Sequence, residues 1–394
     1  MGSLGVRCCT ASVLTAQGIK RDIKTIAASS DSKVLSKYTV WAVLTCALWG
    51  WSSADAQELE LSTSGQTTSD QTTSDQVQGE AVCDVVEVLP SGIPAADWLS
   101  VTTVQYRGEV KQLDGVELQM IDTVGEAVRV PSHRVVRVEP RWRNATAAQT
   151  HQLFVQRRYR ELSTAVPAAL ESDLERWQQR LLIAELVQGA EALGSPRVAG
   201  IYFLSLAESN PPPLLYSVMP LCWTAREPDQ ALRAAAEDWL KSDVEAARLL
   251  GASWLLMGES QLAAQRELTR LQASSNRTLA EIAVAQGWRL IPPPQTMSQL
   301  SAWLEFRDKL TGPLQLGPTE LLSDRLMRIG RNDLALGQWG RIASQHADHP
   351  HRAAVALDAA GNQLRRMGKD QEAQRLETWK SELGLMAAQA PSEP

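Results

Sequence analysis

The sequence predicts a multidomain α+β chain in which a small antiparallel β-barrel precedes an all-α solenoid of stacked helical hairpins. Two observations carry this prediction. Apolar and polar residues alternate between 81 and 140, which is typical of half-buried strands. Beyond residue 145 the chain is rich in Ala, Leu, Glu, Arg and Gln, and small residues recur at fixed offsets, which is typical of helical repeats.

Length and composition limit the classes of function. A chain of 394 residues exceeds a usual single domain, so two or more folded units are expected. The formal net charge of -6 gives no general attraction to nucleic acid or to an anionic membrane surface. Only Cys83 and Cys222 lie beyond the predicted export segment, and without a Cys-x-x-Cys spacing we interpret them as unpaired thiols.

Residues 33–56 have the pattern of a signal peptide. Two lysines precede an apolar run at 39–51, and a small-x-small site ends at Ala56, with cleavage expected before Gln57. As a helix the apolar run rises about 20 Å, which is short of the roughly 30 Å hydrocarbon core of a bilayer. We therefore expect an exported protein that is periplasmic, envelope-associated or secreted. An uncleaved signal segment that anchors the chain in a membrane is the alternative.

Three other segments are expected to lie outside the folded units. Residues 1–32 form an N-terminal extension before the signal, and a translation start assigned too far upstream would account for it. Residues 57–80 repeat Thr-Thr-Ser-Asp-Gln and hold few large apolar side chains, which predicts a disordered linker. Residues 385–394 are predicted to be a disordered tail.

Turn signals divide the segment 81–140 into strands. Asp114-Gly115 predicts a two-residue hairpin turn after a strand at 109–113. The next strand shows strict alternation, and its inward-facing residues are expected to be Val116, Leu118 and Met120. Two shorter strands are expected after the following turns, at 127–130 and 135–138.

This order of strands and turns resembles SH3-like and Sm-like barrels. Sm-like barrels often bind RNA, so the resemblance implies such a function. The charge of this segment argues against RNA binding. Nine acidic and five basic residues give 81–140 a net charge of -4, which is the wrong sign for a phosphate-binding surface. We therefore expect a structural or protein-contacting SH3-like β-barrel at 81–140 and no nucleic-acid partner.

Small residues in the C-terminal half share a common frame. Its copies are Gly251, Trp254, Gly258 and Ala263; Leu326, Gly330, Ala335 and Trp339; Gly361, Leu364, Gly368 and Ala373; and Gly194, Ala199 and Phe203. The frame resembles the tetratricopeptide repeat (TPR) family. The resemblance implies a right-handed α-solenoid over 145–384, in which the first small residue and the Ala allow close helix crossings and the intervening Gly ends a helix. Proline runs at 211–213 and 292–294 break two junctions, so we expect an irregular solenoid of six or seven hairpins.

The sequence offers no catalytic constellation. It contains no nucleophile elbow, Walker A loop, Gly-x-Gly-x-x-Gly fingerprint or His-Glu-x-x-His motif. His346, His349 and His351 cluster around Asp348, but they fall at a predicted junction between hairpins beside Pro350 and have no cysteine partner. We interpret them as a polar loop rather than a zinc or copper site. No catalytic, cofactor-binding or metal-binding residue is assigned, and no cofactor is expected.

The expected function is that of a non-enzymatic exported scaffold that binds a protein or peptide. The resemblance to TPR proteins implies a partner peptide in the groove formed by the first helices of the hairpins. The alternative is a cell-wall-associated or carbohydrate-associated binding protein, or an enzyme with a dispersed site, because thirteen tryptophans could stack on sugars. Their core-like helical spacing favours a structural role instead.

Overall fold

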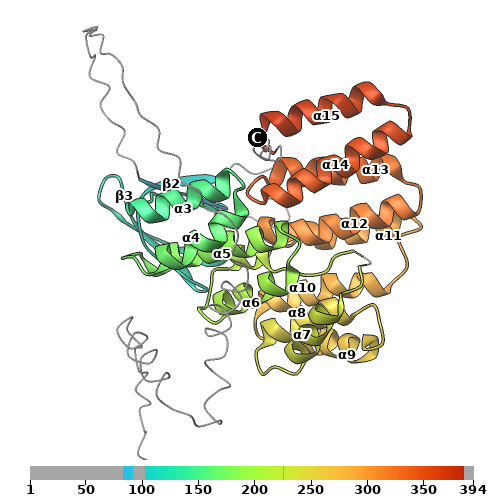
Figure 1. Cartoon of the computed structure of the whole chain (residues 1–394), viewed down its shortest axis with the longest axis horizontal. Helices are drawn as coiled ribbons and strands as arrows, with labels where there is room; N and C mark the ends of the chain where they lie inside the picture. The colour runs from blue at the N-terminus through green and yellow to red at the C-terminus, as the bar shows by residue number, and fades with distance from the viewer. Residues whose placement is uncertain (1–82, 92–102, 225, 386–394) are drawn as a thin grey trace, which may run out of the picture. The chain divides into compact units, whose positions relative to one another are not determined.

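An antiparallel five-stranded sheet is followed by a long series of helices (Figure 1). The computed structural model describes residues 83–91, 103–224 and 226–385. The α+β multidomain class is therefore confirmed. The predicted N-terminal extension, signal peptide and linker lie outside the described residues, and so does the predicted tail except for its first residue.

The sheet is open. Its strands are β1 (Asp84–Val88), β2 (Val104–Leu113), β3 (Glu117–Asp122), β4 (Ala127–Pro131) and β5 (Val135–Glu139). Their order is β4-β3-β2-β1-β5, so β4 and β5 form the two edges. A single 3₁₀ turn, η2 (Ser132–Arg134), connects these edge strands. The sequence pattern predicts β3, β4, β5 and the end of β2, but not β1.

The hairpin between β2 and β3 is longer than predicted. The three residues 114–116 separate the two strands, which pair at Leu113 and Leu118. Val116 lies in this turn and is 69% exposed, so the prediction that it faces inward is wrong. The Asp114 carboxylate accepts hydrogen bonds from the amides of Val116 at 2.8 Å and Glu117 at 3.1 Å, which holds the turn in this form. Leu118 and Met120 are buried, as predicted.

Side chains of α5 (Arg176–Ala192) bind the backbone of β2. The Trp177 indole donates to the Val110 carbonyl at 3.1 Å, and the Arg180 guanidinium donates to the Leu113 carbonyl at 2.5 Å. Both α5 side chains are buried. These carbonyls lie beside a bulge and at the strand end, where β2 leaves groups unpaired, so the helix satisfies them in place of a strand.

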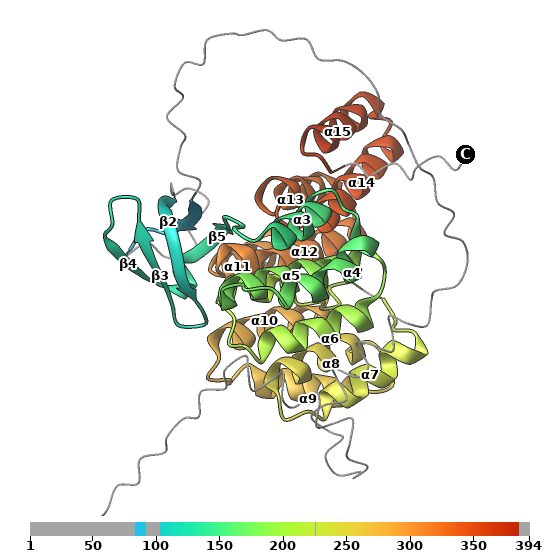
Figure 2. The ribbon, with the colours of Figure 1, turned by 60° about the vertical axis from the view of Figure 1, so that its left-hand side comes forward.

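Thirteen α-helices occupy the described chain from 145 to 382. Their bounds are α3 Ala145–Val155, α4 Tyr159–Leu170, α5 Arg176–Ala192, α6 Pro196–Ala207, α7 Gln230–Leu240, α8 Glu245–Leu255, α9 Gln261–Leu271, α10 Arg277–Gly287, α11 Met297–Asp308, α12 Leu316–Arg328, α13 Asn332–Gln345, α14 Pro350–Arg366 and α15 Asp370–Glu382. Most successive helices pack against one another, as α12 to α15 show in Figures 1 and 2, and the exceptions are the pairs that involve α11. The proline runs at 211–213 and 292–294 lie between α-helices, as predicted.

Three helical hairpins share one turn built around a glycine. Gly194, Gly330 and Gly368 have φ values of 72°, 76° and 73° and end α5, α12 and α14. At Gly330 the glycine amide donates to the Met327 carbonyl at 3.0 Å and the next amide donates to the Leu326 carbonyl at 2.9 Å. This is a Schellman motif, which needs a residue with positive φ, and its presence confirms the predicted role of these glycines.

The fourth turn departs from the frame. In the three shared turns the second helix begins two residues after the glycine, and the alanine five residues after it is buried. After Gly258 the helix α9 begins three residues later, and φ at Gly258 is not positive. The extra residue rotates the helix, so Ala264 is fully buried and Ala263 is exposed. The prediction of a crowded crossing at Ala263 is therefore wrong by one position.

The sequence also predicts close helix crossings at two glycines, Gly251 and Gly361, and only one of them needs glycine. A Cβ atom at Gly251 would lie 2.5 Å from the Ala236 carbonyl oxygen, so the close crossing of α8 and α7 is real. A Cβ at Gly361 would meet only the end of the Arg365 side chain at 3.8 Å, so the crossing predicted there does not need glycine.

Leu385, assigned to the tail, is buried against α13 and α14. In the described part of the chain, no helix has the length and apolarity needed to cross a bilayer.

Candidate binding groove

A cavity of about 580 Å³ runs along one face of α14. The α14 side chains that line it recur every three or four residues, so they share one side of the helix. They are His351, Arg352, Val355, Ala356, Ala359, Asn362, Gln363 and Arg366. We call this cavity the α14 groove. Its apolar middle is open, since Val355 is 53% exposed, whereas Leu357 and Leu364 on the neighbouring face are buried.

The other walls come from segments far apart in the sequence. Helix α12 contributes Glu320, Asp324 and Met327, and α13 contributes Trp339 and Ile342. Glu191 and Pro196 flank the turn between α5 and α6, residues 221–224 and 226 belong to a connecting segment, and Trp254 comes from α8. The groove thus exists only once helices of several hairpins have packed together.

A charged cluster forms one end of the groove, which we call the inner end and define by Glu191, Glu320 and Arg352. The Arg352 Nε donates to Glu320 Oε1 at 2.7 Å and its Nη2 donates to Oε2 at 2.5 Å. Its Nη1 lies 3.4 Å from the Ser217 carbonyl oxygen. This bidentate pair is largely buried, and each nitrogen of the Arg352 guanidinium has an acceptor. Burial opposes the charge of Arg352, but Glu320 and Glu191 raise its pKa above the usual value.

Glu191 is the second carboxylate of the inner end. Among the described residues, none forms a hydrogen bond or a direct ion pair with its side chain. Burial raises the pKa of Glu191 to about 7, while Arg352 lowers it and Glu320 raises it further. Burial and Arg352 both lower the pKa of the neighbouring His351, so that imidazole is neutral at pH 7. With Glu191 ionised, the inner end therefore holds two negative charges and one positive charge.

Three tryptophans line the groove, and one of them depends on a glycine of α12. A Cβ at Gly317 would lie 2.0 Å from the Trp223 ring, so only glycine leaves room for this indole. The Trp254 indole is fixed by a hydrogen bond to the Pro220 carbonyl at 2.9 Å. Trp339 is only partly buried. The aromatic wall is thus positioned mainly by backbone contacts.

A buried polar cluster lies beneath the segment 221–224. The Arg289 Nη1 donates to the Ser253 carbonyl at 2.6 Å and to Gln286 Oε1 at 3.0 Å, and its Nη2 lies 3.4 Å from the Cys222 sulfur. The Cys222 thiol itself reaches the Thr224 carbonyl oxygen at 3.1 Å. These contacts join α8 and α10 to the groove wall. Cys222 and Cys83 are both free thiols, as predicted.

The predicted histidine cluster is placed differently. His346 and His349 lie at the junction between α13 and α14, as expected, but both are buried instead of forming an exposed polar loop. His349 Nε2 lies 3.1 Å from Ser217 Oγ, and burial lowers the pKa of each imidazole to about 3, so both pack as neutral rings. In the described residues, no set of three or more His, Cys, Asp or Glu side chains is arranged to hold a metal ion.

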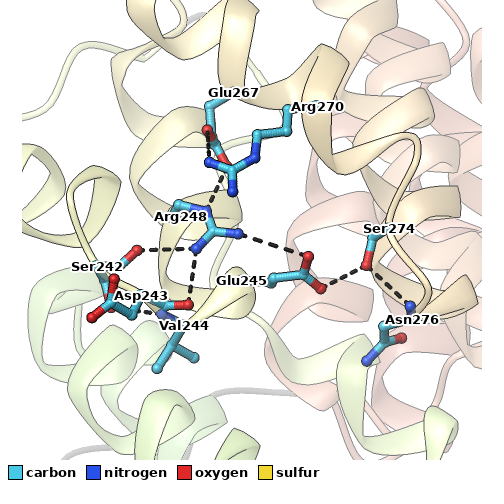
Figure 3. Close-up of polar contacts among 9 residues, drawn as sticks. All are labelled: Ser242, Asp243, Val244, Glu245, Arg248, Glu267, Arg270, Ser274 and Asn276. Carbon is cyan, nitrogen blue, oxygen red and sulfur yellow. Dashed lines mark hydrogen bonds and ion pairs between the residues drawn. The ribbon is translucent and has the colours of Figure 1, made fainter.

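A second polar cluster is structural. Arg248 of α8 donates to Glu267 of α9 at 2.5 Å and to the carbonyls of Ser242 and Asp243 at 3.1 and 2.9 Å (Figure 3). Glu245 accepts a hydrogen bond from Ser274 at 2.6 Å. Figure 3 shows the guanidinium between these groups, and the contacts connect α8 with α9 and with the turn that precedes α8.

Tryptophan burial bears on the sugar-stacking alternative. Of the tryptophans in the described part of the chain, six are less than 10% exposed: Trp177, Trp223, Trp239, Trp254, Trp288 and Trp303. Trp288 and Trp303 stack on each other with ring centroids 4.8 Å apart. The rings of Trp288 and Trp303 thus serve packing between helices, as the helical spacing indicates, whereas Trp223 and Trp254 also line the α14 groove.

Comparisons of the chain with protein-family models, with curated proteins and with solved structures give no match. The fold and the groove therefore define the class of protein: a small antiparallel sheet followed by packed helical hairpins, with the α14 groove among the cavities of the helical part. No groove residue is predicted from the sequence. The one local signal is Val355, a large apolar residue that is 53% exposed on α14, and it becomes informative only when the neighbouring helices are in place.

Proposed function

We propose that this chain is an exported, non-enzymatic scaffold that binds a peptide segment of a partner protein in the α14 groove. The observation that carries the proposal is the lined face of α14. From Arg352 to Arg366 this face extends about 21 Å, which matches about six residues of extended peptide. Charged groups at the ends and an exposed apolar middle are the usual composition of a peptide-binding groove.

The finer architecture that we propose is a TPR-like right-handed α-solenoid. Its support is the recurrence of one Schellman turn at Gly194, Gly330 and Gly368, each followed at five residues by a buried alanine. Most α-helical lining residues come from α12 and α14, the first helices of their hairpins, and α13 adds Trp339 and Ile342. This is the side on which the TPR resemblance places a partner peptide.

For the sheet we propose an SH3-like role in protein contact. The strand order β5-β1-β2-β3-β4 and the 3₁₀ turn η2 before the last strand support the resemblance. The net charge of -4 over 81–140 disfavours a nucleic-acid partner.

Export is proposed from the signal pattern at 33–56 alone. N-terminal sequencing of the mature chain tests it, and we expect a first residue of Gln57. A mature chain that begins upstream of 33 and is recovered with the cytoplasmic fraction would contradict export. One that keeps 33–56 and is recovered with membranes would support the anchored alternative.

The binding proposal is tested with a randomised heptapeptide library and the full chain. We expect selection of a peptide family whose binding is lost in Val355→Glu, because the new charge lies in the apolar middle of the groove. The matched control is Leu262→Glu on α9, since Leu262 is also an exposed apolar helix residue, at 69%, and does not line the groove. Equal loss in both variants, or no selected peptide, would contradict the proposal.

A further inference from the structure

The inner end of the groove has an unbalanced carboxylate. Glu320 forms a bidentate ion pair with Arg352 through two hydrogen bonds, so the two charges compensate each other. Glu191 remains: its side chain has no hydrogen-bond or ion-pair partner among the described residues, and Arg352 and Glu320 are the charged groups that shift its pKa. Two other arginines line the groove, Arg226 in the connecting segment and Arg366 about 21 Å along α14 from Arg352, and neither forms an ion pair or a hydrogen bond with Glu191.

Two features of the fold favour a cation beside Glu191. The residue belongs to the last turn of α5, where the helix dipole disfavours a negative side chain and attracts a positive group. Trp223, Trp254 and Trp339 line the same cavity, and indole rings interact favourably with guanidinium and ammonium groups. Burying an ionised carboxylate without a partner costs free energy, so an ion pair between Glu191 and a cationic ligand group is expected to favour binding.

Resting on the proposed function, we infer that the inner end accepts a basic side chain, Arg or Lys, of the bound peptide, with Glu191 as its counter-ion. The apolar middle around Val355 contacts the rest of the peptide. Because Arg352 is already saturated by Glu320, the inner end does not recognise a carboxylate or a phosphate group. The partner segment is therefore a basic peptide, which also suits a chain with a net charge of -6.

The test uses peptides selected from the randomised heptapeptide library on the full chain. We expect one position of the selected family to be Arg or Lys. Replacing that residue by citrulline, which keeps the shape of Arg without its charge, is expected to weaken the calorimetric Kd about tenfold. In Glu191→Gln the same replacement is expected to change Kd less than about twofold. Glu372→Gln on the exposed face of α15 is the matched control and keeps the tenfold preference.

The outcomes separate the two proposals. Selected peptides that bind in the groove without a basic position, or with an acidic or phosphorylated one, overturn the inference and leave the peptide-binding function standing. An undiminished citrulline effect in Glu191→Gln also overturns it. Loss of all binding in Val355→Glu with retained citrulline sensitivity in the wild-type chain supports both. A failure to select any peptide overturns both together.

Discussion

At the scale of single residues, Glu191 is the groove carboxylate whose pKa is raised to about 7. Its carboxylate lines the groove, has no direct partner among the described residues, and has a pKa raised to about 7 by burial. The local sequence does not indicate this raised pKa, because the residues around Glu191 show only the pattern of a helix. Only the packing of α5 beside Glu320 and Arg352 creates its environment.

The raised pKa of Glu191 predicts how stability depends on pH. The folded protein disfavours the ionised carboxylate, so the cost is absent below about pH 4.5, grows as pH rises and is complete above about pH 7. Glu191→Gln removes it. We expect the variant to gain about 1 to 3 kcal/mol relative to the wild type between pH 4.5 and pH 8, measured by urea unfolding at each pH. A difference that does not vary with pH would contradict this prediction.

The same pKa predicts the pH dependence of binding. A basic peptide gains its counter-ion only when Glu191 is ionised, so affinity is expected to rise from pH 6 to pH 8. Burial lowers the pKa of His351, and any proton that it loses as pH rises removes a positive charge, so His351 does not reverse the trend. Calorimetric titration of a selected peptide at both pH values measures it. The Glu191→Gln variant should show a flat profile, and a rise that persists in it would assign the effect elsewhere.

Gly317 gives a prediction about the groove wall. Alanine there would place a Cβ 2.0 Å from the Trp223 ring, and the overlap outweighs the better helix propensity of alanine. We expect Gly317→Ala to lose about 1 to 3 kcal/mol of unfolding free energy and to shift the tryptophan fluorescence. The control is Gly340→Ala in α13, where nothing lies within 4 Å of the added atom. Equal stability of the two variants would show that Trp223 moves without cost.

At the scale of elements, the glycine and alanine frame predicts helix ends well and helix faces less well. The turns at Gly194, Gly330 and Gly368 follow from local backbone requirements, so a sequence pattern can reveal them. The exposed Ala263 shows the limit, because one extra turn residue after Gly258 rotates the next helix. Val116 shows the same limit in the sheet, since the Asp114 side chain lengthens the hairpin turn.

The repeated turn can be tested at Gly330. Its φ of 76° strains any residue with a Cβ, so Gly330→Ala is expected to cost about 1 kcal/mol in thermal or urea unfolding. Gly337 lies within α13, where an added methyl group would meet no atom within 4 Å. Gly337→Ala is therefore expected to stabilise the chain by up to about 1 kcal/mol. Opposite signs for the two variants confirm the turn, and a stabilising Gly330→Ala would contradict it.

At the scale of the whole molecule, the fold class follows from patterns that each lie within one element, whereas the groove depends on how distant elements pack. Its lining comes from α5, α6, α8, α12, α13 and α14 and from the segment 221–224 with Arg226. The burial of His346 and His349 has the same origin, because Ser217, the partner of His349, lies 132 residues away in the sequence. A sequence without alignment carries no record of such pairings.

Hydrogen–deuterium exchange of the full chain, with and without a selected heptapeptide, tests the central claim most directly. Binding in the α14 groove predicts slower exchange in the walls of the groove, at α12, α14 and the segment 221–224, and unchanged exchange in α9 and the sheet. Protection confined to the sheet edges β4 or β5, or to α9, would contradict the proposed groove.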